Sequence, residues 1–170
     1  GHSRTVTVAH PVDGGTLTTN DALLHYYKTP LSKYSGGNQL DFFTNLSKEN
    51  KILRNNAGCW ESDPNGTLMI VFQTKEKDDY YPRSFEDAFI QINRDFMIAH
   101  QDTFESLKNR DKFDEKDASG KYMHDTYDLA TTCVKNKSSF ALDILLNSKA
   151  NETCTFSNWK IPPYIEEGLL

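Results

Sequence analysis

The stretch that decides the fold lies near the middle of the chain and reads Tyr81-Pro82-Arg83-Ser84-Phe85-Glu86-Asp87-Ala88-Phe89. Pro82 and Ser84 mark the start of a helix, because a serine hydroxyl accepts hydrogen bonds from the first N–H groups of the following turn. The next apolar residues follow the 3.6-residue period of an amphipathic helix, namely Phe85, Ala88, Phe89 and Ile92. We therefore predict that the chain becomes mainly helical from residue 80 onward.

The segment before residue 80 carries the signals of a few strands and short helices. Residues 5–9 (TVTVA) alternate β-branched side chains and predict a strand, and a turn-rich break follows at 11–15. We expect short helices over residues 22–28 and 39–47, with a loop between them. A strong turn signal, Asp63-Pro64-Asn65-Gly66, lies between Cys59-Trp60-Glu61 and the apolar run 68–72. We therefore predict a hairpin in which these two segments are the paired strands.

The segment after this helix start carries further helical patterns. They cover residues 96–107, 122–134 and 139–146, and Pro163 suits the first turn of a terminal helix. Residues 109–120 are dense in Lys and Asp and predict an exposed excursion. The predicted fold is α+β-like, with strands and short helices in residues 4–79 and several helices in 80–170.

Composition excludes several classes of protein. The chain has 170 residues, a length typical of one domain, and its longest apolar run falls far short of the roughly 20 residues that cross a bilayer. No signal peptide opens it, and we interpret residues 1–3 as an expression scar. Three scattered cysteines without C-x-x-C spacing disfavour a zinc or disulfide scaffold and favour the cytoplasm; Cys59 is expected to be a core thiol. The net charge of −5 argues against general nucleic-acid binding but leaves room for a local basic site.

Two places in the sequence could carry chemistry, and the first is the acidic pair Glu86 and Asp87. The simpler interpretation is capping, because carboxylates in a first helical turn interact favourably with the helix dipole. The alternative is functional. Phe85, Phe89 and Ile92 form the buried stripe, so Glu86 projects to another face, where a rigid carboxylate could bind a hard cation such as Mg²⁺ or Mn²⁺.

The second place is the lysine pair Lys135 and Lys137, just before a helix that Ser138 or Ser139 would cap. Cations at a helix N-terminus oppose the dipole, so the pair is unfavourable unless an anion binds there. The simpler interpretation is a solvated basic loop, and the alternative is a phosphate site. A lysine beside metal-bound carboxylates could stabilise a phosphodiester transition state. The histidines lack zinc-protease spacing, and no Walker A, G-x-G-x-x-G or G-x-S-x-G motif occurs.

Four short motifs resemble those of one family, the OLD (overcoming lysogenization defect) ATP-dependent nucleases. Residues 83–89 resemble its R-S-F-E-x-A-F signature, and residues 159–169 resemble its closing W-x-x-P-x-Y-I-x-E-G-L motif. Residues 137–141 are similar to its K-[ST]-x-F-A motif, and Thr18-Thr19-Asn20 resembles its T-[ST]-N. The four occur in family order and cover nearly the whole chain.

The resemblance implies a function and roles for particular residues. Members of this family join an ABC-type ATPase to a C-terminal Toprim domain, a Rossmann-like α/β fold that cuts DNA with divalent metals, and some act against phage. Glu86, with Asp87 beside it, matches the acidic metal-binding position, and Lys137 matches a lysine thought to assist catalysis. Lys135 and Arg83 are expected to contact DNA phosphates. The remaining motif residues are expected to be structural, namely Ser84, Phe85, Phe89, Trp159 and Tyr164.

The departures from the family pattern matter as much. A Toprim domain begins with a Glu-bearing strand and has a later D-x-D strand; neither is visible, and Asp13 is better interpreted as a turn residue. We therefore expect only the C-terminal part of such a nuclease, binding Mg²⁺ or Mn²⁺ weakly and cutting little alone. We expect ATP to bind to an ATPase domain outside this chain. We expect a homo-oligomer to form through other parts of the full-length parent protein. The alternative is a non-catalytic helical module that docks on an ATPase or partner chain.

Overall fold

The computed structural model describes residues 2–6, 25–28, 42–43, 45–73, 80–149 and 158–169, the first of these segments by its backbone alone. The chain divides into two compact units. Unit 1 comprises Gly1–Arg83 and Pro163–Leu170, and unit 2 comprises Ser84–Pro162, so that the second is inserted into the sequence of the first. The predicted mixed α+β character is confirmed: a sheet is followed by four described helices.

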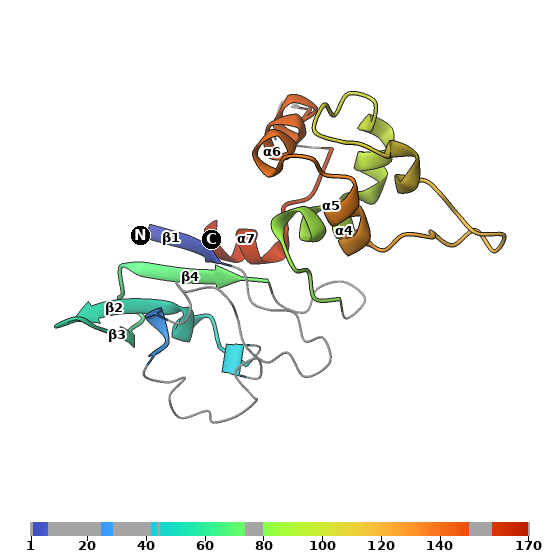
Figure 1. The fold of residues 1–170 in the computed structure, drawn as a ribbon. Helices are drawn as coiled ribbons and strands as arrows, with labels where there is room; N and C mark the ends of the chain where they lie inside the picture. Colours follow the sequence, from blue (N-terminus) through green and yellow to red (C-terminus); the bar gives the residue numbers. More distant parts are fainter. Residues whose placement is uncertain are drawn as a thin grey trace. The chain divides into compact units, whose positions relative to one another are not determined.

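Unit 1 is built on a sheet of strands β1 (His2–Val6), β2 (Ile52–Asn56), β3 (Cys59–Ser62) and β4 (Leu68–Phe72). Their order is β1-β4-β2-β3; β1 runs parallel to β4, and β2 runs antiparallel to both β4 and β3. Successive residues Ile70, Val71 and Phe72 are all buried, so both faces of β4 are covered. The terminal helix α7 (Pro163–Leu169) contacts β4 and β1 (Figure 1).

The predicted hairpin between residues 59–61 and 68–72 is wrong in its pairing, although both strands exist. The hairpin instead joins β2 to β3 through Ala57 and Gly58, whose φ angles of 52° and 91° suit the tight turn that two-residue hairpins favour. Strand β2 therefore lies between β3 and β4. Its mostly polar sequence, Ile52-Leu53-Arg54-Asn55-Asn56, gave no strand signal, and the exposed Cys59 at the start of β3 is not the core thiol that was predicted.

A buried ion pair fastens α7 to the short 3₁₀ helix η1 (Glu49–Lys51). The Lys51 ammonium donates to both carboxylate oxygens of Glu167, at 2.9 and 2.7 Å, and lies 4.8 Å from the centre of the Phe72 ring. Lys51 is only 4% exposed, so its charge depends on this partner. Glu167, in the closing motif, thus has a structural partner.

The buried Tyr27 beside this pair predicts an alkaline loss of stability. Burial, and secondarily the charge of Glu167, raises the pKa of Tyr27 above its ordinary value of 10.0. A pKa raised on folding contributes stability that is present below the unfolded-state pKa and is lost as the pH rises above it. We expect the free energy of unfolding to fall above about pH 10, and Tyr27→Phe to remove part of that fall. Urea denaturation at about pH 8 and pH 11 measures this, with Tyr26→Phe as control; an unchanged pH dependence in Tyr27→Phe would contradict it.

Unit 2 begins with helix α4 (Phe85–His100), which starts where the sequence predicts. The Ser84 hydroxyl accepts a hydrogen bond from the Asp87 N–H, as expected of an N-cap. The helix is kinked at Asn93, whose φ and ψ are −127° and 28°. The Asn93 side chain donates to the Lys160 carbonyl at 2.8 Å and accepts from the Lys160 N–H at 2.6 Å, which fixes the segment before α7.

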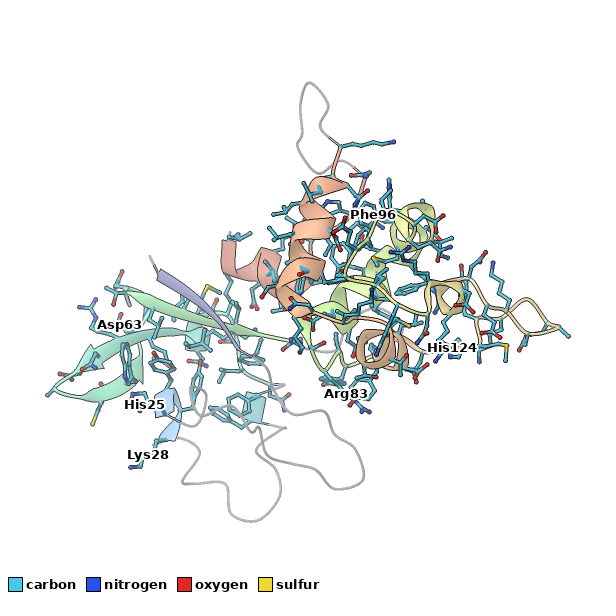
Figure 2. All side chains as sticks on the ribbon, turned by 45° about the horizontal axis from the view of Figure 1, so that its top comes forward. His25, Lys28, Asp63, Arg83, Phe96 and His124 are labelled. Carbon is cyan, nitrogen blue, oxygen red and sulfur yellow. The ribbon has the colours of Figure 1, made fainter. Side chains whose placement is uncertain are left out.

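Three further elements complete unit 2: the 3₁₀ helix η3 (Arg110–Phe113) and the helices α5 (Thr126–Thr132) and α6 (Lys137–Leu146). The core that they enclose is strongly aromatic; Phe96, labelled in Figure 2, packs against Phe89 and Phe104 with ring centres 5.9 and 6.0 Å apart. Trp159 lies against Phe89 at 5.4 Å and donates to the Ser148 hydroxyl at 2.7 Å. The expected structural roles of Phe89 and Trp159 agree with these contacts.

Several predicted boundaries in this half require correction. The pattern over 96–107 is not a second helix, because α4 continues to His100 and turns follow. The helix predicted over 122–134 is confined to α5, and α6 is capped by Asn136 rather than by Ser138 or Ser139. The excursion at 109–120 is largely exposed but anchored, since Phe113 is fully buried and Arg94 donates to the carbonyls of Phe113 and His124.

Several predictions fall wholly or partly outside the described residues, including the strand beyond Val6, the loop 31–39, Asp13 and the motif Thr18-Thr19-Asn20. His25, Tyr26 and Lys28 are helical, as are Phe42 and Phe43, within the two short helices that were predicted. Strand β1 starts at His2, earlier than the predicted residue 5, so that residues 2 and 3 of the interpreted expression scar pair with β4. No described helix is long and apolar enough to cross a membrane.

Candidate functional site

The structure brings together the two candidate residues that the sequence singled out separately. Lys137 is the first residue of α6 and Glu86 the second residue of α4, and the Lys137 ammonium lies 3.4 Å from a Glu86 carboxylate oxygen. The Glu86 side chain is 5% exposed, whereas that of Lys137 is 76% exposed. The ammonium of an exposed lysine therefore contacts a nearly buried carboxylate.

Aromatic packing holds this pair of motifs in place. Phe140, one turn after Lys137, packs against Phe85 and Phe89 with ring centres 6.5 and 6.0 Å apart. The R-S-F-E segment and the K-S-x-F-A segment thus share one apolar contact and one ionic contact. Since Phe140 and Phe89 are fully buried, the starts of α4 and α6 are fixed relative to each other.

Glu86 is a nearly buried carboxylate with one recorded ionic partner. Burying a carboxylate costs several kcal/mol unless hydrogen bonds or a countercharge offset the loss of water. Glu86 lies in the first turn of α4, where the helix dipole favours negative charge. Among the described residues, Lys137 is the cation paired with it, and Lys137 itself stands at a helix N-terminus where the dipole disfavours a positive charge. The charge of Glu86 is thus only partly compensated.

Asp87 has a different environment from its neighbour. It is 0% exposed, and one carboxylate oxygen accepts a 2.7 Å hydrogen bond from the Thr126 hydroxyl at the start of α5. This bond joins α4 to α5 and makes Asp87 a positioning group. Its proposed role as a metal ligand stays a prediction.

The remaining candidates have contacts or positions of their own. The Lys135 N–H donates to the Ser106 carbonyl at 2.9 Å, and its ammonium reaches the Glu105 carbonyl at 3.3 Å. Arg83 directly precedes the Ser84 cap and is partly buried (Figure 2), and Tyr164 is 2% exposed in α7. The expected contacts of Lys135 and Arg83 with DNA phosphates stay predictions.

The described residues do not form a metal centre by themselves. They contain no group of three or more His, Cys, Asp or Glu side chains arranged to hold an ion. Mg²⁺ commonly binds through one or two protein carboxylates, with waters and substrate phosphates completing its shell. Glu86 could supply one such ligand. The described residues nevertheless contain fewer metal-binding carboxylates than the family's metal site requires.

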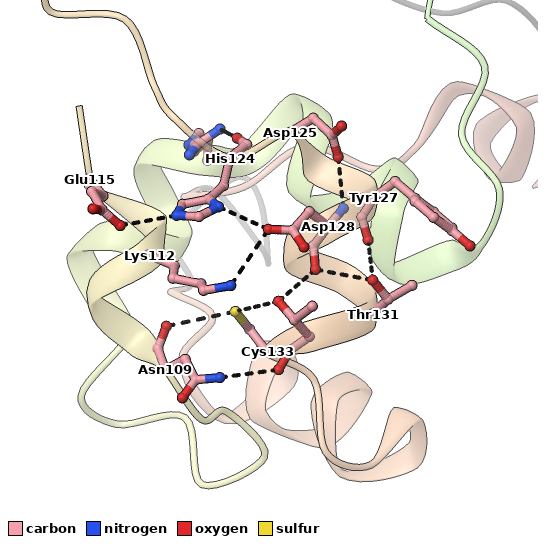
Figure 3. Close-up of polar contacts among 11 residues, drawn as sticks. Asn109, Lys112, Glu115, His124, Asp125, Tyr127, Asp128, Thr131 and Cys133 are labelled. Carbon is pink, nitrogen blue, oxygen red and sulfur yellow. Dashed lines mark hydrogen bonds and ion pairs between the residues drawn. The ribbon is translucent and has the colours of Figure 1, made fainter. Parts of the chain in front are cut away.

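A polar network around His124 was missed at the level of the sequence (Figure 3). The His124 ring lies between two carboxylates, with Nδ1 2.9 Å from Asp128 and Nε2 3.0 Å from Glu115, and Lys112 lies 3.7 Å from Asp128. The two ring nitrogens thus bridge Asp128 and Glu115. Because both ring nitrogens already have partners, His124 is arranged to link the excursion to α5 rather than to act as a general base. We call the three residues His124, Glu115 and Asp128 the His124 clasp. The one feature of the sequence that could have predicted this network is the spacing of four residues between His124 and Asp128.

Cys133 lies in the same network and is not arranged as a nucleophile. Burial raises the pKa of its thiol, and its sulfur lies 3.5 Å from the Thr132 hydroxyl and 3.6 Å from the Asn109 carbonyl. A raised pKa keeps the sulfur protonated, and only the thiolate attacks.

The clasp predicts a local effect of mutation. His124→Gln removes the ring that bridges Asp128 and Glu115, so amide exchange in residues 114–124 should rise about fivefold, corresponding to roughly 1 kcal/mol for partly exposed pairs. Exchange at the buried Leu129 should stay as in the wild type. The matched control is Lys108→Gln, which changes an exposed residue away from the clasp. Equal exchange in the two variants would show that the clasp does not hold the excursion.

Comparisons of the chain with protein-family models, with curated proteins and with solved structures found no match. Assignment to the OLD family therefore stays a prediction from its short motifs.

Proposed function

We propose that this chain is the C-terminal Toprim portion of an OLD-like, ATP-dependent DNA endonuclease that acts in the bacterial cytoplasm, with a possible role in phage defence. The observation that carries the proposal is the 3.4 Å contact between Lys137 and Glu86, residues of two motifs that are distant in the sequence. A chance resemblance gives no reason for the basic and acidic motif positions to meet. The parallel pairing of β1 and β4 is compatible with part of a Rossmann-like sheet.

The chemistry proposed for this chain rests on its own two residues. The long stem and high exposure of Lys137 let its ammonium turn from Glu86 to a phosphate oxygen, where it would stabilise developing negative charge. Glu86 would hold one side of a cation site that carboxylates outside the described residues complete. Mg²⁺ or Mn²⁺ bound there would supply the activated water.

A second candidate function is a non-catalytic helical module that docks on an ATPase or a partner chain. The specific observation in its favour is the apolar outer surface of α6, where Leu142, Leu145 and Leu146 are 59%, 52% and 81% exposed. In that case the Lys137–Glu86 pair would only align α4 and α6.

A plasmid-cutting experiment separates the two. Supercoiled DNA incubated with Mn²⁺ and this 170-residue chain should stay intact, whereas the full-length gene product should nick it. The control is the full-length product in EDTA, which should not cut. Efficient cutting by the chain alone would show that the acidic groups were misjudged, and a full-length product that binds a partner but never cuts DNA would favour the docking module.

A further inference from the structure

The turn between β3 and β4, Asp63-Pro64-Asn65-Gly66, contains the one Asn-Gly dipeptide of the sequence. The Gly66 N–H donates to the Asp63 carbonyl at 2.8 Å, which is the bond that closes a β-turn with proline in its second position. Asn65 is exposed, and its side-chain amide makes no hydrogen bond to the described residues. This amide is therefore free of the contacts that would hold it away from the backbone.

An asparagine followed by glycine is open to attack from its own backbone, because glycine has no Cβ to shield the neighbouring nitrogen. The Gly66 nitrogen, on losing its proton, forms a bond to Cγ of Asn65, while the bond from Cγ to the side-chain nitrogen breaks and ammonia leaves with that proton. Water then opens the cyclic imide at either carbonyl. One product has an ordinary aspartate at this position, and the other has isoaspartate, in which the backbone runs through the side-chain carbons. Both products add a negative charge.

Two side chains of the turn restrain this reaction. The Asp63 carboxylate accepts from the Asn65 N–H at 2.7 Å and pairs with the Arg54 guanidinium at 2.6 Å. Arg54 also donates to the Asn65 carbonyl at 2.8 Å, so the peptide groups on both sides of Asn65 are held. The imide can form only when the bond from the Gly66 N–H to the Asp63 carbonyl breaks. We call the pair Arg54 and Asp63 the turn lock.

The turn lock slows the reaction without preventing it. The side chains of Arg54 and Asp63 are 51% and 29% exposed, and ion pairs that are this exposed contribute little stability. A surface turn held in this way opens more often than the core of the unit. Deamidation of Asn65 should therefore be slower in the folded chain than in the unfolded chain, but still measurable.

The isoaspartate product does not fit the space that the turn occupies. Gly66 lies against the backbone of Leu53, and a Cβ added at Gly66 would overlap the Leu53 carbonyl. Isoaspartate adds one carbon to the backbone immediately before this contact. Leu53 is 1% exposed and pairs with Ser62 of β3 and Leu68 of β4. A displaced turn would therefore disturb β2 between its two neighbours in the sheet.

We propose that Asn65 is a site of spontaneous deamidation, that the turn lock sets its rate, and that the isoaspartate product loosens the sheet of unit 1. The modification consumes water and releases ammonia, so it needs no enzyme, oxidant or cofactor. It does not depend on the proposed function. Because the ammonia is lost, the modified fraction of the protein grows with its age.

The first test follows the 170-residue chain during incubation near neutral pH, in buffer and in urea. Peptide mass spectrometry measures deamidation at Asn65, and methylation by an isoaspartyl methyltransferase measures isoaspartate. Arg54→Met should raise the rate in buffer about 2- to 5-fold, the effect expected of a partly exposed ion pair. Arg54→Lys, which keeps a cation beside Asp63, should react more slowly than Arg54→Met. Lys108→Met is the matched control and should react like the wild type.

The second test uses the isoaspartate product after its separation from the unmodified chain. Its amide exchange should be faster at Leu53 and Leu68 and unchanged at the buried Leu129 of unit 2. An Asn65 that stays unmodified in buffer while the chain in urea is converted would overturn the site. Equal rates in the wild type and Arg54→Met would overturn the role of the turn lock, and unchanged exchange at Leu53 would overturn the loosening of the sheet.

Discussion

Replacing Lys137 by Ala in the full-length protein should lower the rate of Mg²⁺- or Mn²⁺-dependent DNA nicking by about 100- to 1000-fold. That is the usual effect of removing one group that stabilises charge in a transition state. The ammonium is exposed and lies 3.4 Å from Glu86, so it can reach a phosphate without rearrangement of the core. The measurement is the initial rate of conversion of supercoiled to open-circular plasmid.

The same substitution also leaves Glu86 buried without its partner, so activity and stability must be measured separately. Lys137→Ala alone should lose about 1 kcal/mol of stability, a modest value because Lys137 is largely solvated. Adding Glu86→Gln removes the uncompensated charge and should restore stability while nicking stays low. Lys108→Ala is the control lysine in unit 2. Near-wild-type nicking by both Lys137→Ala and Glu86→Gln would reject the assignment of this site.

Phe140→Ala should destabilise unit 2 by about 3–5 kcal/mol, the usual cost of deleting a buried aromatic ring. Phe140 is 0% exposed, and its ring packs against Phe85, Phe89 and Phe104. Removing it should open a cavity where α4 and α6 meet, and thereby separate Glu86 from Lys137. Urea denaturation followed by fluorescence in a Trp60→Phe background, where Trp159 is the remaining tryptophan, reports on this unit.

The control for Phe140→Ala lies on the same helix. Leu146→Ala removes a side chain that is 81% exposed and should change the free energy of unfolding by less than about 0.5 kcal/mol. If the two substitutions had equal effects, the aromatic contact would not be what holds the motifs together. A large effect of Leu146→Ala would instead indicate that a partner covers α6.

The sequence predicted those parts of the fold that local chemistry determines. Ser84 and Pro163 mark true helix starts, and the apolar run 68–72 is a strand, because caps, prolines and short apolar runs act within a few residues. Strand β2 escaped recognition because its side chains are mostly polar, while backbone pairing with β3 and β4, a long-range property, holds it in the sheet. The strong Asp63–Gly66 turn signal was accordingly assigned to the wrong pair of strands.

The candidate site likewise has features that the sequence predicted and features that depend on the fold. The motifs identified Glu86 and Lys137, but the nearly complete burial of Glu86 is a result of tertiary packing, which periodicity alone does not give. Asn136 rather than a serine caps α6, since several polar residues in a row offer equivalent caps. Neither the His124 clasp nor the pairing of Arg54 with Asp63 leaves a distinctive local pattern.

The insertion of unit 2 between Arg83 and Pro163 makes α7 dependent on a distant part of the chain. The helix that completes unit 1, and whose Glu167 satisfies the buried Lys51, is synthesised only after all of unit 2. During translation, Lys51 therefore stays without this partner until Glu167 has been synthesised. A truncation that removes Glu167 would consequently leave the Lys51 ammonium buried without its partner, a costly arrangement for unit 1.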